Sequence, residues 1–415
     1  MSEPTALADT FVRDHLPPKA EWPELVFTLP ELRYPERLNA AATLLEGKGE
    51  AVAVRSEDRN WSFGDINSLS NRIACVLAGD LALAPGNRVL LHGPNTAVTA
   101  ACWLAILKAG GVAVATMPMY RARELSAIIA KGRVTHALCD AALVNELAAA
   151  QKSTPVLERM VSFGPDGDLE SLTQGKPDGF EAVKTFAHDP ALIAFSSGTT
   201  GEPKGCVHFH RDVLAMADTF SRHVLKPGSA DIFAGTPPLS FTFGLGGLLV
   251  FPFHAGASAV LNAAKGIEGL AKDIARFRAT TLFTSPTAYR ALLPLAKTHD
   301  FSSLKACVSA GETLPKATSD AWFEATGIRA IDGIGATEMI HIFISASGQD
   351  IRPGATGKPV PGYRACLLDD EGKVLPKGAT GRLAVKGPTG CRYLADPRQR
   401  EYVQQGWNVT GDIYR

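Results

Sequence analysis

The sequence has no excess of either charge and no long apolar run. Its 415 residues contain 42 basic and 42 acidic side chains, so the formal net charge is zero. This balance does not favour binding to nucleic acid or to an anionic membrane. The apolar stretch at residues 245–253 is far shorter than the ~20 residues of a membrane-spanning helix. The N-terminus lacks the basic and apolar segments of a signal peptide, so we expect a cytoplasmic protein without a membrane partner.

Cysteine is sparse, and no two cysteines have CxxC spacing. The seven cysteines are scattered and odd in number, which argues against a disulfide framework or a zinc knuckle. We therefore expect free thiols. The sequence also lacks a fixed-period repeat and a low-complexity tract. Because the chain is too long for one ordinary core, we expect two or three subdomains.

Short apolar segments alternate with helical patterns along most of the chain. Residues 88–92 and 112–117 are predicted strands, and residues 97–108 between them form a predicted helix. Another helix should begin after Ser62, where Ser62 and Asp65 resemble a capping box. This alternation predicts mostly parallel sheets that are covered by helices on both faces.

The pattern changes beyond about residue 345. Residues 363–369 and 373–375 read as a hairpin, and residues 382–386 read as a further strand. This region therefore predicts a small antiparallel β subdomain.

A loop rich in glycine and hydroxyl groups follows the predicted strand at residues 191–195. It reads Ser196-Ser197-Gly198-Thr199-Thr200-Gly201-Glu202-Pro203-Lys204-Gly205. Its glycines let backbone amides turn toward one point, and its hydroxyls and Lys204 add donors, which is how a loop holds a polyphosphate. The loop is not a Walker A motif, because Lys204 lies three residues past Gly201 and is followed by Gly205. A P-loop phosphotransferase is therefore excluded.

This loop resembles the phosphate-loop motif of the adenylate-forming superfamily. That superfamily includes acyl- and aryl-CoA ligases, peptide-synthetase adenylation domains and luciferases. Further segments resemble its motifs in the same order and extend the resemblance over nearly the whole chain. These segments are residues 309–312, 332–338, 381–385 and 407–412.

The resemblance implies a role for several single residues. Thr337 should contact the α-phosphate of ATP, and Glu338 should help to hold Mg²⁺, a hard cation suited to carboxylate and phosphate oxygens. Asp412 should accept hydrogen bonds from the ribose hydroxyls. Asp332 should accept one from the adenine amino group, and Lys204 should offset phosphate charge.

The complete set of residues that the resemblance assigns to ATP is larger. It comprises Ser196, Ser197, Gly198, Thr199, Thr200, Gly201, Lys204, Gly311, Glu312, Asp332, Gly333, Thr337 and Asp412. The expected catalytic residues are Lys204, Thr337, Glu338 and His341, where His341 orders the substrate or the nearby nucleotide. Core packing remains the alternative for His341.

One departure from the superfamily pattern and one further resemblance indicate the benzoate-CoA ligase branch. Ile334 occupies a position where many members have tyrosine, and the segment at residues 241–246 resembles the substrate-side loop of that branch. A flat apolar pocket suits a benzene ring. Its expected residues are Phe241, Thr242, Phe243, Gly335, His341 and Ile342.

The N-terminal arm resembles 2-aminobenzoate-CoA ligases more than plain benzoate enzymes. The resemblance covers residues 11–18 and 35–39. In such an enzyme, the Thr242 hydroxyl would meet the ortho-amino group of the substrate. We therefore expect an AMP-forming acid–CoA ligase that uses ATP and Mg²⁺, with CoA as co-substrate and 2-aminobenzoate or benzoate as the acid.

Three alternatives stay open or are set aside. The acceptor is either CoA or the phosphopantetheine of a carrier protein, because both reactions begin with the same adenylate. A module that binds an acyl-adenylate without catalysis is a second alternative, which the intact Lys204, Glu338 and Asp412 disfavour. His208 and His210 have the spacing of a metal pair on a strand, but no third ligand accompanies them, so we expect core histidines.

The expected fold is α/β, with two stacked αβαβα-type subdomains, mostly parallel sheets and a small antiparallel β-barrel-like subdomain. The predicted divisions are 1–185, 186–345 (with the phosphate loop and aryl pocket) and 346–415. By resemblance, the superfamily continues through a hinge to a small C-terminal domain that carries a lysine for adenylation. We expect the present chain to lack that domain, to bind ATP or aryl-adenylate, and to form thioester poorly.

Overall fold

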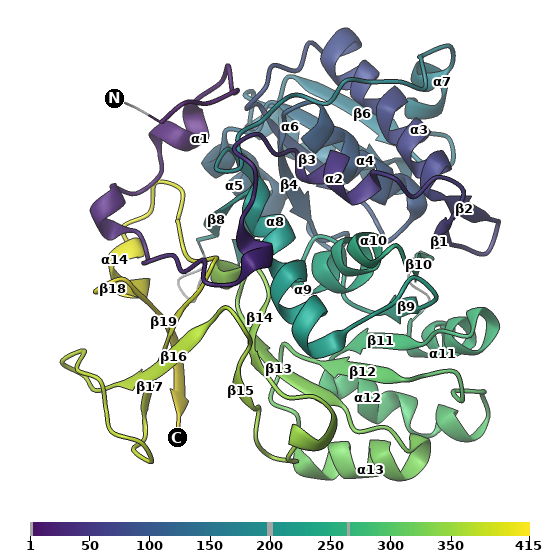
Figure 1. Cartoon of the computed structure of the whole chain (residues 1–415). Coiled ribbons are helices and arrows are strands. Elements are labelled where there is room, and N and C mark those ends of the chain that lie inside the picture. The colour runs from purple at the N-terminus through teal and green to yellow at the C-terminus, as the bar shows by residue number, and fades with distance from the viewer. Residues whose placement is uncertain (1–2, 197–201, 264–265) are drawn as a thin grey trace.

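The computed structural model describes residues 3–196, 202–263 and 266–415, and the strands in these ranges form three sheets (Figure 1). Six described strands make up the first sheet. Their order is β6 (Arg159–Phe163), β5 (His136–Asp140), β3 (Arg88–His92), β4 (Val112–Thr116), β7 (Pro190–Ser196) and β8 (Lys204–Phe209). All neighbours are parallel except β7 and β8, which pair antiparallel.

The second sheet contains nine strands of the described residues. Their order is β15 (Lys358–Pro359), β14 (Ile342–Ser345), β13 (Ile331–Gly335), β12 (Ala306–Ser309), β11 (Thr281–Thr284), β9 (Ile232–Gly235), β10 (Ser258–Val260), β1 (Val52–Arg55) and β2 (Asn60–Ser62). The strands from β13 to β1 are parallel, and antiparallel strands close both edges. Because β1 and β2 join this sheet while β7 and β8 join the first, the two sheets exchange strands across the division predicted at residue 185.

The third sheet is antiparallel and lies at the C-terminal end (Figure 1). Its order is β16 (Arg364–Leu368), β17 (Gly381–Lys386), β19 (Trp407–Tyr414) and β18 (Val403–Gln404). The hairpin expected between residues 363–369 and 373–375 forms over a few residues: Val374 bridges Leu368 antiparallel, and the Leu375 N–H donates to the Leu367 carbonyl at 2.8 Å. β16 also pairs with β17, whose apolar side chains are buried, whereas Val374 is 55% exposed.

Helices pack around the sheets, and together these elements confirm the expected α/β fold with largely parallel sheets and a small antiparallel one. The α-helices within the described ranges are α1 (Phe11–Asp14), α2 (Ala40–Leu45), α3 (Phe63–Cys75), α4 (Ala97–Lys108), α5 (Ala122–Gly132), α6 (Val144–Ser153), α7 (Leu169–Thr173), α8 (His210–Met216), α9 (Thr242–Leu245), α10 (Phe251–Ala255), α11 (Gly266–Phe277), α12 (Pro286–Leu292), α13 (Lys316–Thr326) and α14 (Gln399–Tyr402). None of the helices in these ranges is long and apolar enough to cross a membrane. The seven cysteines are free thiols, as expected.

Two helices show how the sequence determines local structure. α3 begins at the predicted capping box, in which Asp65 N–H donates to the Ser62 hydroxyl and Ser62 N–H donates to the Asp65 carboxylate. α4 begins after Thr96, whose hydroxyl accepts from the Thr99 N–H. Nearly every side chain of α4 is buried, because a helix that is apolar on all sides belongs inside the core.

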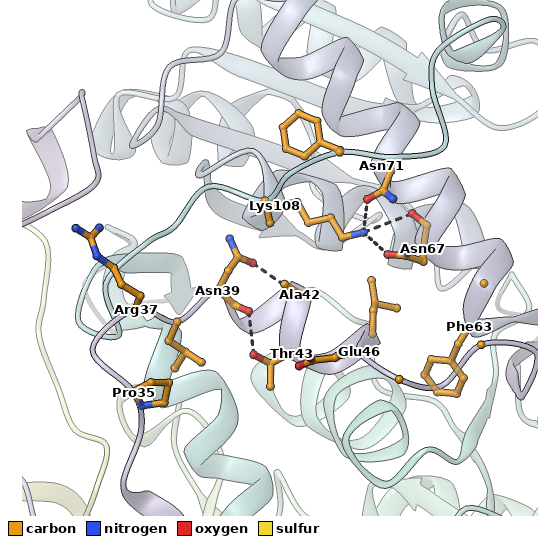
Figure 2. A pocket seen from close by; sticks show the side chains of 17 residues that line it. Pro35, Arg37, Asn39, Ala42, Thr43, Glu46, Phe63, Asn67, Asn71 and Lys108 are labelled. Carbon is orange, nitrogen blue, oxygen red and sulfur yellow. Dashed lines mark hydrogen bonds between the residues drawn. The ribbon is translucent and has the colours of Figure 1, made fainter.

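The last residue of α4, Lys108, is buried and has no carboxylate partner among the described residues. It is only 3% exposed and lines a cavity of about 690 Å³ in the N-terminal part of the chain (Figure 2). Its ammonium donates to Asn67 Oδ1 at 2.7 Å, Ser70 Oγ at 2.7 Å and Asn71 Oδ1 at 2.6 Å. Burial lowers the pKa of Lys108 to about 7, because the charged form is partly removed from water.

Lys108 should therefore make the free energy of unfolding rise with pH between about 7 and about 10. In that range the unfolded lysine, with a pKa of about 10.4, keeps its proton while the folded one releases it. The expected slope is up to ~1.4 kcal/mol per pH unit. Chemical denaturation of Lys108→Met at pH 7, 8 and 9 should show this slope removed, with Lys272→Met at an exposed lysine as the control. Equal pH dependence in Lys108→Met and the unaltered chain would contradict this assignment.

Candidate active site

The candidate site lies where parallel strands of the second sheet end. β11, β12 and β13 are adjacent and parallel, so their carboxyl ends lie at one edge of the sheet. Ligands of open α/β sheets bind at this edge. The residues that follow β13 form the short 3₁₀ helix η8 (Thr337–Met339), which carries two of the expected catalytic side chains.

One cavity at this edge is mainly apolar and has a volume of about 480 Å³. It brings together all six residues expected to bind the aromatic ring, namely Phe241, Thr242, Phe243, Gly335, His341 and Ile342. Thr242 is the first residue of α9 and is half-buried. Pro237, Pro238 and Ala310 also line the cavity; Ala310 belongs to the motif at residues 309–312, whereas the two prolines belong to none of the motifs.

His341 is packed into a wall of aromatic rings. Its ring centroid lies 4.5 Å from that of Phe251, 5.5 Å from Phe220 and 5.7 Å from Phe243. Gly246 makes room for it, since a Cβ there would lie 2.4 Å from the imidazole. Burial lowers the pKa of His341 to about 3, although the Phe243 backbone acts in the opposite direction, so the ring is neutral near pH 7.

The neutral ring of His341 lines the apolar cavity with unused hydrogen-bonding capacity. Neither of its nitrogens makes a hydrogen bond of ordinary geometry to the described residues. A buried polar group of this kind usually has a partner. His341 is therefore suited to a hydrogen bond with a polar group of a bound molecule and unsuited to donating a proton as a cation.

A second cavity, of about 290 Å³, adjoins the first and is polar. It collects the predicted nucleotide residues Gly311, Glu312, Asp332, Gly333 and Asp412, which come from three separate motifs. The two cavities share Gly311 and Gly335. Thr356 and Tyr414 also line the polar cavity, and their hydroxyls lie 3.1 Å apart.

Asp332 and Asp412, two of the three carboxylates that line the polar cavity, differ in their surroundings. Burial raises the pKa of Asp332 to about 6, although the Gly333 N–H favours the ionised form. Its Oδ1 atom is buried and has no hydrogen-bond partner among the described residues. Asp412 is exposed and follows Gly411, whose φ of +85° suits glycine. The Oδ1 atom of Asp332 is therefore an acceptor that lacks a donor among the described residues.

Lys204 and Glu338 meet at the other side of the site. Lys204 begins β8, and its Nζ lies 3.6 Å from Glu338 Oε1. The Tyr393 hydroxyl donates a hydrogen bond to the same Glu338 oxygen, and Lys204 lies 5.2 Å from the Tyr393 ring centroid. Glu338 is buried, and its carboxylate is held by the Lys204 cation and the Tyr393 hydroxyl.

Part of the predicted phosphate loop lies outside the described residues. Ser196 ends β7 and Lys204 begins β8, so the two described ends of the loop are adjacent in the sheet, where Ser196 pairs with Lys204. The expected nucleotide residues Ser197, Gly198, Thr199, Thr200 and Gly201 fall in the range that is not described. Their roles stay predictions.

A Mg²⁺ ion at Glu338 would need phosphate and water oxygens as its other ligands. In the part of the chain that the structure describes, no group of three His, Cys, Asp or Glu side chains could hold a metal ion. Glu338 uses Oε1 for its contacts with Lys204 and Tyr393. A Mg²⁺ ion bound here would thus take Glu338 together with phosphate and water oxygens, which is the usual manner of binding for this ion.

The two histidines with metal-like spacing have different partners. His208 lies in β8 and its Nε2 is 2.8 Å from the carbonyl oxygen of Thr337. His210 begins α8, and its Nδ1 accepts from the Ala40 N–H at 3.2 Å. Both are fully buried, in keeping with the expected core histidines.

The fold and the site define an α/β protein with a divided cleft at the carboxyl ends of its strands. The chain belongs to the AMP-binding enzyme family, whose model matches residues 41–393. This membership confirms the resemblance that the motifs carry and establishes that the protein is an enzyme of that family.

Several known proteins are similar to the chain over most of its length. The benzoate–CoA ligase of Thauera aromatica is 32% identical over 403 residues, which are 93% of this chain and 76% of that protein. The anthranilate–CoA ligase of Pseudomonas aeruginosa is 32% identical over 346 residues, 80% of this chain and 65% of that protein. The crystal structure of an anthranilate CoA ligase in complex with anthranoyl-AMP superposes with a TM-score of 0.89 at 34% identity, covering 93% of this chain and 77% of that one.

Proposed function

We propose that this chain forms the nucleotide- and acid-binding part of an ATP-dependent aryl-acid–CoA ligase whose preferred acid is 2-aminobenzoate. The observation that carries the proposal is the junction of the two cavities. The apolar cavity, which is lined by all six residues expected to bind the aromatic ring, shares Gly311 and Gly335 with the polar cavity, and Thr337 lines it at the start of η8. An aryl-adenylate has this same division into an aromatic ring, a phosphate and a nucleoside.

The proposed reaction has two steps. A carboxylate oxygen of the acid attacks the α-phosphorus of ATP, the bond to pyrophosphate breaks, and aryl-AMP forms. The CoA thiolate then attacks the acyl carbon, and AMP leaves with the electron pair of the broken C–O bond. The protein needs no covalent intermediate, because its work is alignment and charge neutralisation around phosphorus.

Each residue of the site has a proposed task in this reaction. The Thr337 hydroxyl donates to an α-phosphate oxygen, and Lys204 offsets the charge of the leaving pyrophosphate. Asp332, with its unpaired buried oxygen, accepts from the adenine amino group, and Asp412 accepts from the ribose hydroxyls. Mg²⁺ bound at Glu338 would supply further neutralisation of phosphate charge.

The neutral His341 fits a positional task at the acid. Its ring lies in the wall of the apolar cavity and lacks a hydrogen-bond partner of ordinary geometry among the described residues. A bound acid or adenylate brings oxygen atoms to this wall. We therefore assign His341 to orienting the acyl group rather than to proton transfer.

The test of the proposed function is thioester formation by the whole natural protein. The enzyme should convert 2-aminobenzoate and benzoate to thioesters in an ATP-dependent reaction that yields AMP, with salicylate and fluorobenzoates as comparison acids. Supplying CoA in one series and a phosphopantetheinylated carrier protein in another identifies the acceptor. Turnover of fatty acids but of no aromatic acid would overturn the proposal.

Thr242 is expected to determine the preference for an ortho-amino group. Thr242→Val has nearly the same volume but lacks the hydroxyl, so the ratio of kcat/KM for 2-aminobenzoate to that for benzoate should fall about 3- to 10-fold, the range of one neutral hydrogen bond of ~0.5–1.5 kcal/mol. Thr242→Ser keeps the hydroxyl and should keep the ratio. An unchanged ratio in Thr242→Val would rule out this role.

A further inference from the structure

The short helix η8, which carries Thr337 and Glu338, is fastened at each of its residues. The Thr337 carbonyl accepts from the Ile340 N–H at 3.1 Å and lies 2.8 Å from His208 Nε2. The Glu338 side chain accepts from the Tyr393 hydroxyl. The Met339 carbonyl accepts from the Thr389 hydroxyl at 2.8 Å. Three residues of one turn are thus held by two segments, β8 and residues 389–393.

The backbone that ends η8 needs such support. Ile340 has φ +66° and ψ −31°, in the left-handed half of conformational space. A β-branched residue rarely adopts a positive φ, and a strained backbone of this kind costs ~1–3 kcal/mol. Such a conformation persists only where the surroundings determine it, and strained positions of this kind cluster at functional sites.

Strand β8 supplies the contacts on one side of η8. Side chains two apart on a strand share a face, and Lys204, Cys206 and His208 have this spacing. Lys204 reaches the Glu338 carboxylate at 3.6 Å, the Cys206 thiol lies 3.9 Å from the Glu338 carbonyl, and His208 reaches the Thr337 carbonyl. One face of β8 therefore lies against the residues that we assign to the α-phosphate and to Mg²⁺.

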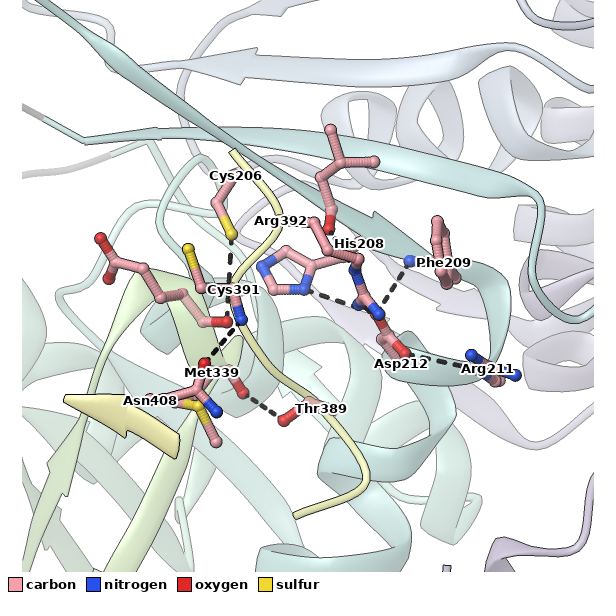
Figure 3. A network of polar contacts seen from close by, with 12 residues as sticks. Cys206, His208, Phe209, Arg211, Asp212, Met339, Thr389, Cys391, Arg392 and Asn408 are labelled. Carbon is pink, nitrogen blue, oxygen red and sulfur yellow. Dashed lines mark hydrogen bonds and ion pairs between the residues drawn. The ribbon is translucent and has the colours of Figure 1, made fainter. Parts of the chain in front are cut away.

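His208 is the rigid member of this face. Its side chain is fully buried, and because a carbonyl oxygen only accepts, Nε2 carries the proton and donates it to Thr337. On the other side of the ring, Nδ1 lies 3.6 Å from Asp212 Oδ2. Asp212 is itself held by the Arg392 guanidinium and by the Phe209 N–H at 3.0 Å (Figure 3). The imidazole is thus fixed between a buried ion pair and η8.

We propose that His208 is a positioning residue for adenylate formation. By donating to the Thr337 carbonyl it fixes η8, so that the Thr337 hydroxyl and the Glu338 carboxylate stay aligned on the α-phosphate. This inference rests on the proposed function. Loss of the hydrogen bond lets a strained turn relax, and a displacement of ~1 Å at a reacting centre costs about 100-fold in rate.

Four variants test the role of His208. His208→Leu removes the donor, His208→Gln places an N–H near the position of Nε2, and His208→Asn is polar but too short to reach Thr337. His210→Gln is the matched control, because His210 is equally buried but contacts Ala40 rather than η8. The measurement is the single-turnover rate of aryl-AMP formation. Each rate is divided by the concentration of enzyme that binds a non-hydrolysable aryl-adenylate, so that unfolded protein is not counted.

A positioning role predicts a specific pattern in the rate. His208→Leu and His208→Asn should lower kcat about 10- to 100-fold, with KM for the acid changed less than about threefold because the walls of the apolar cavity are untouched. His208→Gln should recover most of the rate, and His210→Gln should keep it. If His208→Leu does not fold, the difference in rate between His208→Gln and His208→Asn tests the positioning role instead.

The outcomes separate this inference from the function on which it rests. Unimpaired kcat in folded His208→Leu, or equal rates for the Gln and Asn variants, would overturn the positioning role alone. Failure of the unaltered enzyme to form any aryl-AMP would overturn the proposed function, and the positioning role with it.

Discussion

Replacing Glu338 by Gln is expected to lower the rate of aryl-AMP formation about 100- to 1,000-fold, the range for removal of one charge-stabilising group from a preorganised site. The change keeps the shape of the side chain, and the Tyr393 hydroxyl can still donate to the amide oxygen in place of Glu338 Oε1. It removes the negative charge that Mg²⁺ needs as a ligand and that lies 3.6 Å from Lys204. The effect should therefore fall on charge neutralisation rather than on folding.

The measurement is ATP–pyrophosphate exchange by the whole natural protein at saturating acid. Binding of a non-hydrolysable aryl-adenylate needs no Mg²⁺, so its Kd should change little in Glu338→Gln. Glu324→Gln, at an exposed position of α13, serves as the control for the loss of one carboxylate. Exchange within threefold of the unaltered rate in Glu338→Gln would remove Glu338 from the proposed chemistry.

Arg392→Met is expected to lower the free energy of unfolding by about 3–5 kcal/mol, because it leaves Asp212 as a buried charge without its cation. Both side chains are fully buried, and they are joined by a hydrogen bond from the guanidinium. Burial favours protonated Asp212, yet the Arg392 guanidinium holds its pKa below the ordinary value. The loss corresponds to a fall in Tm of about 4–6 °C for a chain of this length.

A second replacement identifies the cause of this loss. In Asp212→Leu/Arg392→Met both members of this buried ion pair are removed, so much of the stability should return. The surface pair Lys316–Asp320 is the control, since Asp320→Ala should cost less than ~1 kcal/mol. Without Arg392, burial should raise the pKa of Asp212, so the deficit of Arg392→Met should shrink as the pH falls from that raised pKa toward the lowered pKa of the unaltered chain. A double variant no more stable than Arg392→Met would contradict this account.

Local sequence signals predicted most of the fold where they act over short distances. The capping box at Ser62 and Asp65 and the apolar run of α4 specify their helices through neighbouring residues, and both form as expected. The hairpin near Val374 is also local, and its bridge to Leu368 forms as expected. The pairing of β16 with β17 joins segments that are farther apart in the chain, so turn residues alone do not reveal it.

The same distinction applies to the candidate site. The motifs at residues 309–312, 332–338 and 407–412 are continuous in sequence, and the structure groups most of their expected residues in two adjoining cavities. The supporting residues His208, Tyr393 and Thr389 were missed as contributors. Their contacts with η8 span 50 to 129 positions of the chain, so no local spacing reveals them. Of these three residues, only His208 belongs to a sequence pattern, and its spacing with His210 is typical of metal binding rather than of a support for η8.

The most direct test of the central claim is calorimetric binding of a non-hydrolysable 2-aminobenzoyl-adenylate to residues 1–415. If the two adjoining cavities form one aryl-adenylate site, the compound should bind with one-to-one stoichiometry, and both ATP and 2-aminobenzoate should compete with it. Asp412→Ala should weaken the binding of the compound and of ATP but leave the binding of 2-aminobenzoate unchanged. Binding that neither ATP nor the acid displaces, or an Asp412→Ala variant that binds ATP normally, would contradict the claim.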